Sequence, residues 1–371
     1  MNNLATLFLI CSLSFLHPFL KANDYIQYQT YSSPNPKRKV HHFKVNPRRI
    51  NIEIVNGTDN CVGIERVSDI AKRKGAILAI NGGYFQGGSL LGAPDGPMKI
   101  NSLLCGYRSG ETGALGYIKG ERSAHIDRIK MDVKLFCRGH TFPIDAINRN
   151  LYDNTNVLYT HNFNSTTLTT DSGKSFQITN VIKPSFNSGG HTIPHGGYVF
   201  AQGKNVHPKV PLFLMNRPVQ IRASLRPILN PERINQWKGF ENIINGVVIL
   251  SNFSTIRDYH KEGVSNTITK NKHARTAIGL DDNGWWHIVI VEAKHQGNIG
   301  MTMDELGDLM KKLGCRFALS LDGGGSSTFY YKGNTKQFLT HKEHSFMQSN
   351  VYYHPEGGER PVGNAIVFKP K

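Results

Sequence analysis

Residues 317–331 read FALSLDGGGSSTFYY, an apolar strand that stops at an aspartate followed by three glycines and two serines. Successive glycines leave their backbone N–H groups unobstructed, so the segment can fold into a concave cradle for an anion. The carboxylate of Asp322 comes where the strand meets this cradle. The pattern predicts a site for sugars or phosphates, and the alternative is a glycine-rich turn with a capping aspartate. The cradle residues expected to bind substrate are Gly323, Gly324, Gly325, Ser326 and Ser327.

The segment before this strand has the pattern of a helix. Thr302-Met303-Asp304-Glu305 matches a capping box, in which the first and fourth residues satisfy each other's backbone N–H groups. Apolar residues follow at helical spacing, and Gly314 is expected to end the helix. The order is therefore helix, glycine, apolar strand and polar-Gly-Gly loop.

Residues 68–85 repeat that order. Ser68-Asp69 can cap a short helix, Gly75 ends it, and the strand AILAI leads into the loop Asn81-Gly82-Gly83. If both strands lie in one sheet and point the same way, Asn81 and Asp322 converge, because ligands gather beyond the carboxyl ends of such strands. We therefore expect Asn81 and Gly82 to contact the same substrate as the cradle.

The rest of the chain reads mostly as strands. INIEIV at residues 50–55 alternates between apolar and polar positions, and residues 275–291 have the pattern of a hairpin with an Asn-Gly turn. The predicted fold class is α+β: a single sheet-rich domain with few helices that contains two helix-Gly-strand-(Asn/Asp)-Gly-Gly units.

The N-terminal residues indicate export. Residues 4–16 form an apolar segment too short to span a membrane, and Leu20-Lys21-Ala22 offers a cleavage point before Asn23. We expect a signal peptide at residues 1–22, a linker or arm at 23–39 and the functional domain at 40–369, in a secreted or periplasmic protein without stable membrane insertion. The sequence does not indicate an oligomeric state.

Four cysteines remain after the predicted cleavage, and none has CxxC spacing. An exported protein can form two disulfides from them in any of three pairings, and buried thiols are the alternative. No neighbouring base favours a catalytic thiol. The four residues are Cys61, Cys105, Cys137 and Cys315.

The chain is strongly basic, with 44 Lys and Arg against 27 Asp and Glu and a formal net charge of +17. This charge favours polyanionic partners such as phosphorylated glycans, although a solvated basic surface is the simpler interpretation. The basic clusters at residues 37–39 and 48–49 lack the context of a nucleic-acid-binding module, so no nucleic acid is expected. His191 and His195 flank a proline rather than lying on a helix, and we expect no metal or cofactor.

The motifs AINGGYF, HARTAIGL, GMTMDELGDLMKKLG, SLDGGGSSTFYY and GGERPVGNAIVF resemble, in this order, those of the phosphodiester glycosidase family. The resemblance covers roughly residues 40–369. It implies hydrolysis of a sugar-1-phosphodiester, such as an N-acetylglucosamine-1-phosphodiester. The family tends to have Asp-Gly-Arg where this chain has Glu292-Ala293-Lys294. Lysine cannot make the bidentate contact of arginine to phosphate, so substrate choice is in question more than reaction class.

The predicted chemistry needs negative charge near the anomeric carbon and positive charge at the departing phosphate, because the transition state resembles an oxocarbenium ion. Asp322 is the candidate for the first role and Arg275 for the second, with a structural ion pair as the alternative for Arg275. Glu292 is a reserve carboxylate. Further substrate contacts are expected from Lys294 and His295, and the family resemblance adds Asn364 at the pocket floor.

The leading functional prediction is a secreted glycosidase that acts on a sugar-1-phosphodiester and binds a phosphorylated glycan as substrate. A non-catalytic glycan or cell-envelope binding module on the same fold is the alternative. A basic nucleic-acid binder is a third interpretation, which predicts steep salt dependence of binding.

Overall fold

The computed structural model describes residues 20–23, 25–121, 123–169, 173–185, 190–293, 297–332, 345–348 and 359–371. Strands dominate these residues, and the helices are few and short, so the prediction of a single sheet-rich α+β domain is confirmed. No helix among the described residues is long and apolar enough to cross a membrane. The helices are α1 (Val67–Lys74), α2 (Ile234–Gly239), α3 (Asn266–Lys270) and α4 (Met303–Lys312).

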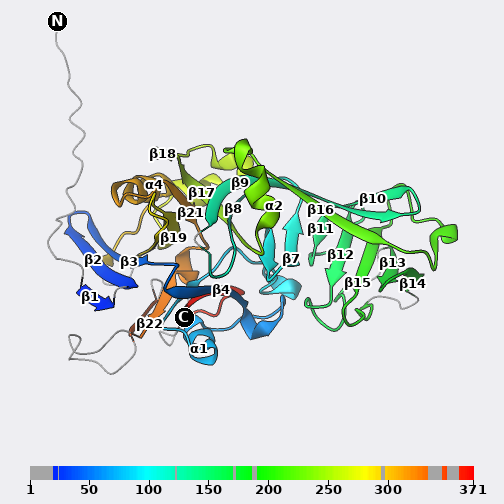
Figure 1. Cartoon of the computed structure of the whole chain (residues 1–371), viewed down its shortest axis with the longest axis horizontal. Helices are drawn as coiled ribbons and strands as arrows, with labels where there is room; N and C mark the ends of the chain where they lie inside the picture. The colour runs from blue at the N-terminus through cyan, green and yellow to red at the C-terminus, as the bar shows by residue number, and fades with distance from the viewer. Residues whose placement is uncertain are drawn as a thin grey trace, which may run out of the picture.

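The larger sheet runs through the whole molecule (Figure 1). Its central strands follow the order β2-β3-β20-β19-β21-β17-β8-β9-β16, and each pairs antiparallel with its neighbours. The strands are β1 (Leu20–Asn23), β2 (Ile26–Pro34), β3 (Lys37–Val45), β6 (Met98–Ile100), β7 (Leu103–Arg108), β8 (Glu111–Tyr117), β9 (Ala124–Cys137), β10 (His140–Ile144), β11 (Ala146–Ile147), β12 (Asn156–Thr160), β13 (Gly173–Ile178), β14 (Ile182–Pro184), β15 (Tyr198–Gly203), β16 (Gln220–Pro227), β17 (Asn242–Ser251), β18 (Ser254–Thr255), β19 (Arg275–Leu280), β20 (Trp286–Val291) and β21 (Phe317–Ser320).

A second sheet of five strands has the order β23-β22-β5-β24-β4. Its apolar side chains, such as Ile80 and Phe329, pack against those of the larger sheet, such as Phe43 and Leu319, in one core. α4 packs on the other face of the larger sheet and α1 on the other face of the smaller one, so helices cover both outer faces of the pair (Figure 1). The strands are β4 (Ile50–Asn56), β5 (Leu78–Asn81), β22 (Thr328–Tyr331), β23 (Ser345–Gln348) and β24 (Asn364–Pro370).

Local sequence signals explain where α4 begins and where both helices end. The Thr302 hydroxyl accepts from the Glu305 N–H at 3.2 Å, and the Glu305 carboxylate accepts from the Thr302 N–H at 2.9 Å, which confirms the capping box. Gly75 and Gly314, with φ of 66° and 85°, lie in the left-handed region that glycine adopts without steric cost.

The predicted cap of the first helix is wrong. α1 begins at Val67, and its N-cap makes no side-chain hydrogen bond. Instead, the Ser68 N–H donates to the carboxylate of Glu359, 291 residues later in the chain, at 3.0 Å. A contact this distant in sequence leaves no local signal.

Two further expectations need correction. Residues 26–34 and 37–45 form the hairpin of β2 and β3, and β3 continues into the sheet through β20, so the expected linker contains ordered strand. β5 and β21 lie in different sheets, and all their strand partners are antiparallel, so the predicted parallel arrangement is wrong. The hairpin of β19 and β20 is confirmed, with Arg275 opposite Val291.

Candidate active site

The loops after β5 and β21 meet directly, although the strands lie in different sheets. The Asn81 side-chain amide donates to the Asp322 carbonyl at 2.7 Å, and the Asp322 N–H donates to the Gly82 carbonyl at 3.2 Å. The predicted convergence of Asn81 and Asp322 is therefore present. Two sheets packed face to face produce it, rather than adjacent parallel strands.

Asn81 joins these loops from the inside. It is fully buried, and its Oδ1 accepts from the Thr276 hydroxyl at 2.7 Å and from the Thr328 N–H at 3.2 Å. Since both ends of its amide are used within the protein, the side chain is not available to a sugar. The structure makes Asn81 a positioning residue for Asp322.

Two other buried asparagines hold the loop after β5. Asn364 Oδ1 accepts from the Gly83 N–H at 2.8 Å, and Asn245 Oδ1 accepts from the Tyr84 N–H at 2.8 Å. Asn364 is 1% exposed, so its side chain supports the loop rather than facing solvent. A Cβ on Gly82 would lie 2.1 Å from Asn364 Oδ1, so close packing requires glycine there.

The glycine-rich segment after Asp322 does not form the open cradle that its sequence suggests. It folds into a short 3-10 turn, η7 (Gly324–Ser326), and Gly324 donates its N–H to the Ala274 carbonyl at 2.8 Å. The N–H groups of Ser326 and Ser327 also donate to carbonyls within the turn, at 3.2 Å each. The prediction that these amides bind phosphate is therefore wrong for three of them, because their N–H groups already donate to backbone carbonyls.

Asp322 itself is a predicted residue that is partly exposed rather than fully buried. One of its carboxylate oxygens accepts from the Gly323 N–H at 2.9 Å. Burial raises the pKa of Asp322, while the Ser326 hydroxyl and the charge of Arg360 act to lower it. Ser326 Oγ is buried, and apart from this interaction with Asp322 it has no hydrogen-bond partner within the described residues.

Tyr84 lies beside Asp322 and was missed by the sequence analysis. Burial raises the pKa of Tyr84, and the negative charge of Asp322 raises it further, so the phenol stays protonated at neutral pH. Arg275 and the Ser320 hydroxyl act on the same phenol in the opposite direction. These effects place Tyr84, Asp322, Ser320 and Arg275 close together on one face of the larger sheet.

Arg275 is committed to the protein backbone. It is 2% exposed, its Nε donates to the Met301 carbonyl at 2.9 Å, and its Nη2 donates to the carbonyls of Ile268 and Asn271 at 2.7 and 2.9 Å. Burial lowers the pKa of this guanidinium. Its fork cannot clamp a phosphate in the predicted way, because two of its three nitrogens are already used.

Glu292 belongs to a separate buried network. It is fully buried, and its carboxylate accepts from His41 at 2.8 Å and from the Asn298 side-chain amide at 3.0 Å, with Lys39 at 3.4 Å. Burial acts to raise the pKa of Glu292, but these partners outweigh it and lower the pKa. β19 separates β20, which ends just before Glu292, from β21, which leads to Asp322. Glu292 is therefore not a second carboxylate beside Asp322, and the predicted contacts Lys294 and His295 lie outside the described residues.

Charged residues that the sequence analysis did not select surround Asp322 instead. Asp95 acts to raise the pKa of Asp322, and Asp95 is paired with Arg149 at 2.6 Å. Arg360, whose charge acts on the same carboxylate, lies over the ring of Phe85 at 6.0 Å. Arg360 lies in the motif GGERPVGNAIVF, which was the available signal for it, whereas Asp95 and Arg149 lie outside the five motifs.

The remaining predictions concern cysteines and metals. All four cysteines are buried free thiols, so the predicted disulfides are wrong and the alternative of buried thiols holds. Within the described residues, no group of three or more His, Cys, Asp and Glu side chains is close enough to hold a metal ion.

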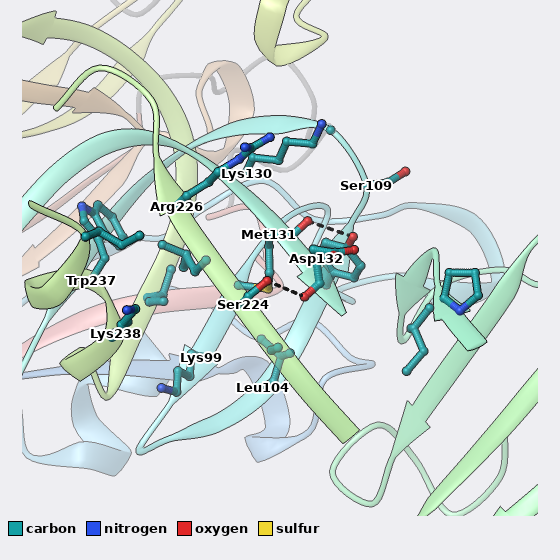
Figure 2. Close-up of a pocket in the computed structure, with 18 of the residues that line it drawn as sticks. Lys99, Leu104, Ser109, Lys130, Met131, Asp132, Ser224, Arg226, Trp237 and Lys238 are labelled. Carbon is teal, nitrogen blue, oxygen red and sulfur yellow. Dashed lines mark hydrogen bonds between the residues drawn. The ribbon is translucent and has the colours of Figure 1, made fainter. Parts of the chain in front are cut away.

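A separate cavity of about 1050 Å³ lies between β7, β9, β16 and α2 (Figure 2). Leu104, Met131 and Leu225 are among its lining residues, and Figure 2 shows Lys99 and Lys238 at one side. None of the residues predicted to be catalytic or to bind substrate lines this cavity.

Comparisons with known structures support the fold. A hypothetical protein from Synechocystis is 20% identical with a TM-score of 0.74, and the match covers 94% of this chain and 63% of that one. This chain therefore spans less than two-thirds of the length of the Synechocystis protein. A putative exported protein from Burkholderia pseudomallei is 16% identical with a TM-score of 0.70, covering 90% and 74% of the two chains.

The catalytic domain of zebrafish N-acetylglucosamine-1-phosphodiester alpha-N-acetylglucosaminidase is a more distant match. It is 15% identical with a TM-score of 0.48, covering 97% of this chain and 87% of that one. No curated protein matches the chain in sequence. The sequence model described as phosphodiester glycosidase matches residues 170–369, more than half of the chain. The chain belongs to the phosphodiester glycosidase family.

Proposed function

We propose that the protein is an exported glycosidase that hydrolyses a sugar-1-phosphodiester to the free sugar and a phosphomonoester. Family membership supports the reaction class. The single observation that carries the assignment of the site is Asp322, a partly exposed residue where the loops of two sheets meet, whose charge acts to raise the pKa of Tyr84. Export and the N-acetylglucosamine-like sugar rest on the sequence analysis.

In the proposed mechanism, Asp322 stabilises positive charge at the anomeric carbon as the bond to the phosphate oxygen breaks. The phosphomonoester departs without full protonation, so one carboxylate suffices where ordinary glycosidases use two. The raised pKa of Asp322 keeps this carboxylate basic enough to accept a proton from the attacking water.

Arg360 replaces Arg275 as the proposed partner of the phosphate. Its charge reaches Asp322, whereas the donors of Arg275 are used by backbone carbonyls. The protonated phenol of Tyr84 donates a hydrogen bond to a substrate oxygen. The buried hydroxyl of Ser326 acts on the carboxylate of Asp322 itself.

The test is the release of free sugar from N-acetylglucosamine-α-1-phosphomethylmannoside by purified protein. We expect Asp322→Asn to lower kcat by about 10²–10⁴-fold. Asp282→Asn, at an exposed turn aspartate, serves as the matched control and should leave turnover unchanged. Equal turnover by wild type and Asp322→Asn would remove Asp322 from the mechanism.

One observation favours the second candidate, a glycan-binding module without catalysis. Glu292 and Arg275, two of the three predicted catalytic residues, are used inside the protein. A binding module predicts no turnover of any sugar-1-phosphodiester together with binding of the same compounds. Isothermal titration calorimetry with N-acetylglucosamine-α-1-phosphomethylmannoside and wild-type protein, read together with the turnover assay, separates the two candidates.

A further inference from the structure

One end of the molecule contains few acidic residues and carries a net positive charge. Residues 133–222, here called the distal lobe, contain nine lysines and arginines against three aspartates and no glutamate. The lobe has its own apolar core, and Figure 1 shows its strands β10 to β15 at the end of the molecule away from α4. A net positive charge concentrated in one lobe favours association with an anionic surface.

The distal lobe also carries the most exposed hydrophobic side chains among the described residues. Leu212 is 78% exposed, Tyr152 is 63% exposed and Phe213 is 61% exposed, whereas the other exposed large hydrophobic side chains reach at most 41%. Leu212 and Phe213 are adjacent in the 3-10 turn η3 (Leu212–Leu214). Tyr152 lies on a neighbouring loop, where its backbone packs against Gly203.

The turn that presents Leu212 and Phe213 is firmly held. Leu214 is fully buried in the lobe core, and its N–H donates to the Pro211 carbonyl at 3.1 Å. After the turn, Ile182 of β14 exchanges backbone hydrogen bonds with Asn216 at 2.8 Å and with Arg217 at 3.1 Å. The two apolar side chains therefore project from a fixed base, and ordering them on binding costs little entropy.

Cations flank this turn. The ring of Phe213 lies 5.3 Å from the ring of His140, the first residue of β10. Arg138 lies in the turn between β9 and β10. Arg138 follows Cys137, whose thiol donates to the Leu214 carbonyl at 4.0 Å, and Arg217 comes three residues after Leu214, so both arginines lie near the base of the turn. Neither arginine has an ion-pair partner among the described residues, and both are exposed.

We propose that the distal lobe docks the protein onto an anionic lipid bilayer, with Leu212 and Phe213 inserted at the interface and Arg138 and Arg217 against the lipid headgroups. Burial of apolar side chains combined with attraction of nearby cations is how proteins bind such interfaces without spanning them. The docking is peripheral and needs no membrane-spanning helix. It is independent of the reaction proposed for Asp322.

Charge and size argue against the other occupants of this surface. A second copy of the chain would bring the same excess of positive charge to the interface. Two exposed side chains are also far short of the 20–30 residues that each partner typically contributes to a stable protein interface. A soluble anionic glycan would engage the arginines but would leave Leu212 and Phe213 in water, where their exposure costs free energy.

The experiment is co-sedimentation of the mature protein with vesicles of phosphatidylcholine alone and of phosphatidylcholine mixed in equal parts with phosphatidylglycerol. We expect binding to the mixed vesicles only, weakening as salt is added. Arg138→Gln with Arg217→Gln should weaken binding about 30-fold, because each cation near such a surface contributes about five-fold. The matched control is Arg48→Gln with Arg49→Gln, at two exposed arginines outside the lobe, which should bind as wild type.

The apolar contribution is tested separately. Leu212→Ser with Phe213→Ser should weaken binding at least about ten-fold. Leu91→Ser with Phe253→Ser, at residues 39% and 40% exposed outside the lobe, is the control. In Phe213→Trp the added indole fluorescence should shift to shorter wavelength when mixed vesicles are added, which reports insertion directly.

Three outcomes would overturn the proposal. The first is equal binding to neutral and mixed vesicles, or no binding to either. The second is retention of binding to mixed vesicles by both lobe double variants. The third is concentration-dependent dimerisation that Leu212→Ser with Phe213→Ser abolishes, because the turn would then be an interface between copies of the chain.

Discussion

Replacing Asn81 tests whether the residue contacts substrate or positions Asp322. The Asn81 side chain makes three short contacts inside the protein: with the Asp322 carbonyl, the Thr276 hydroxyl and the Thr328 N–H. Asn81→Ala removes all three and leaves these buried polar groups without that partner. The loops that carry Gly82 and Asp322 then lose a side-chain link between the two sheets.

The magnitude follows from the three contacts. Leaving a buried polar group unsatisfied costs about 1–3 kcal/mol, and partial relaxation reduces the sum, so we expect Asn81→Ala to lower the free energy of unfolding by about 3–6 kcal/mol. A domain is typically stable by about 5–15 kcal/mol, so the loss is large but measurable by urea unfolding. Thr276→Val removes only one of the contacts and should cost about 1 kcal/mol.

The assay is a double-mutant cycle between Asn81→Ala and Thr276→Val, measured by urea unfolding and by kcat/KM. We expect a coupling free energy of about 1 kcal/mol from the shared hydrogen bond, and a loss of activity that accompanies the loss of stability. Normal stability of Asn81→Ala together with reduced kcat/KM would refute the positioning role and restore a direct contact with substrate.

Three further variants test individual features of the fold. Burial raises the pKa of Asp322 above its unfolded value, so the stability that this group contributes is lost as pH rises through the folded pKa. Asp322→Asn should therefore have a higher urea midpoint than wild type at neutral pH. A lower midpoint would contradict this sign. The partners of Glu292 lower its pKa, so the stability that this carboxylate contributes is present at neutral pH and lost as pH falls below about 4. The free energy of unfolding of Glu292→Gln, measured by urea unfolding, should be about 1–3 kcal/mol below that of wild type at pH 7 and equal to it in acid. Gly75→Ala places a side chain at φ 66° with no neighbour within 4 Å, so urea unfolding should show a cost of about 1–2 kcal/mol from backbone strain alone.

Local signals in the sequence were reliable where the interactions they describe are local. The capping box at Thr302 needs a partner only three residues away, and Gly75 and Gly314 end helices through their own backbone conformation. The hairpin of β19 and β20 follows from its turn and its apolar runs. Such features depend on the residue and its near neighbours, so one sequence suffices to predict them.

The roles of the site residues depended on contacts between distant segments. The pattern at Asp322 marked a loop that meets the loop after β5, but the availability of Arg275 and Glu292 is set by carbonyls, histidine and lysine from other elements. Their residue types are compatible with catalysis, yet their hydrogen bonds are already made. Sequence alone cannot count the partners of a buried polar group.

The sequence by itself determined the sheet-rich class, the two helix-glycine-strand units and the position of Asp322 in a loop that needs glycine. Tertiary structure decided that these units lie in different sheets and that Asn81 links them. It also decided that Arg360 and Asp95 rather than Glu292 are the charged groups that act on Asp322. The physical reason is that helix ends and turns are stabilised within a few residues of chain. A site is stabilised by packing and hydrogen bonds between segments up to about 280 residues apart, as Gly83 and Asn364 are.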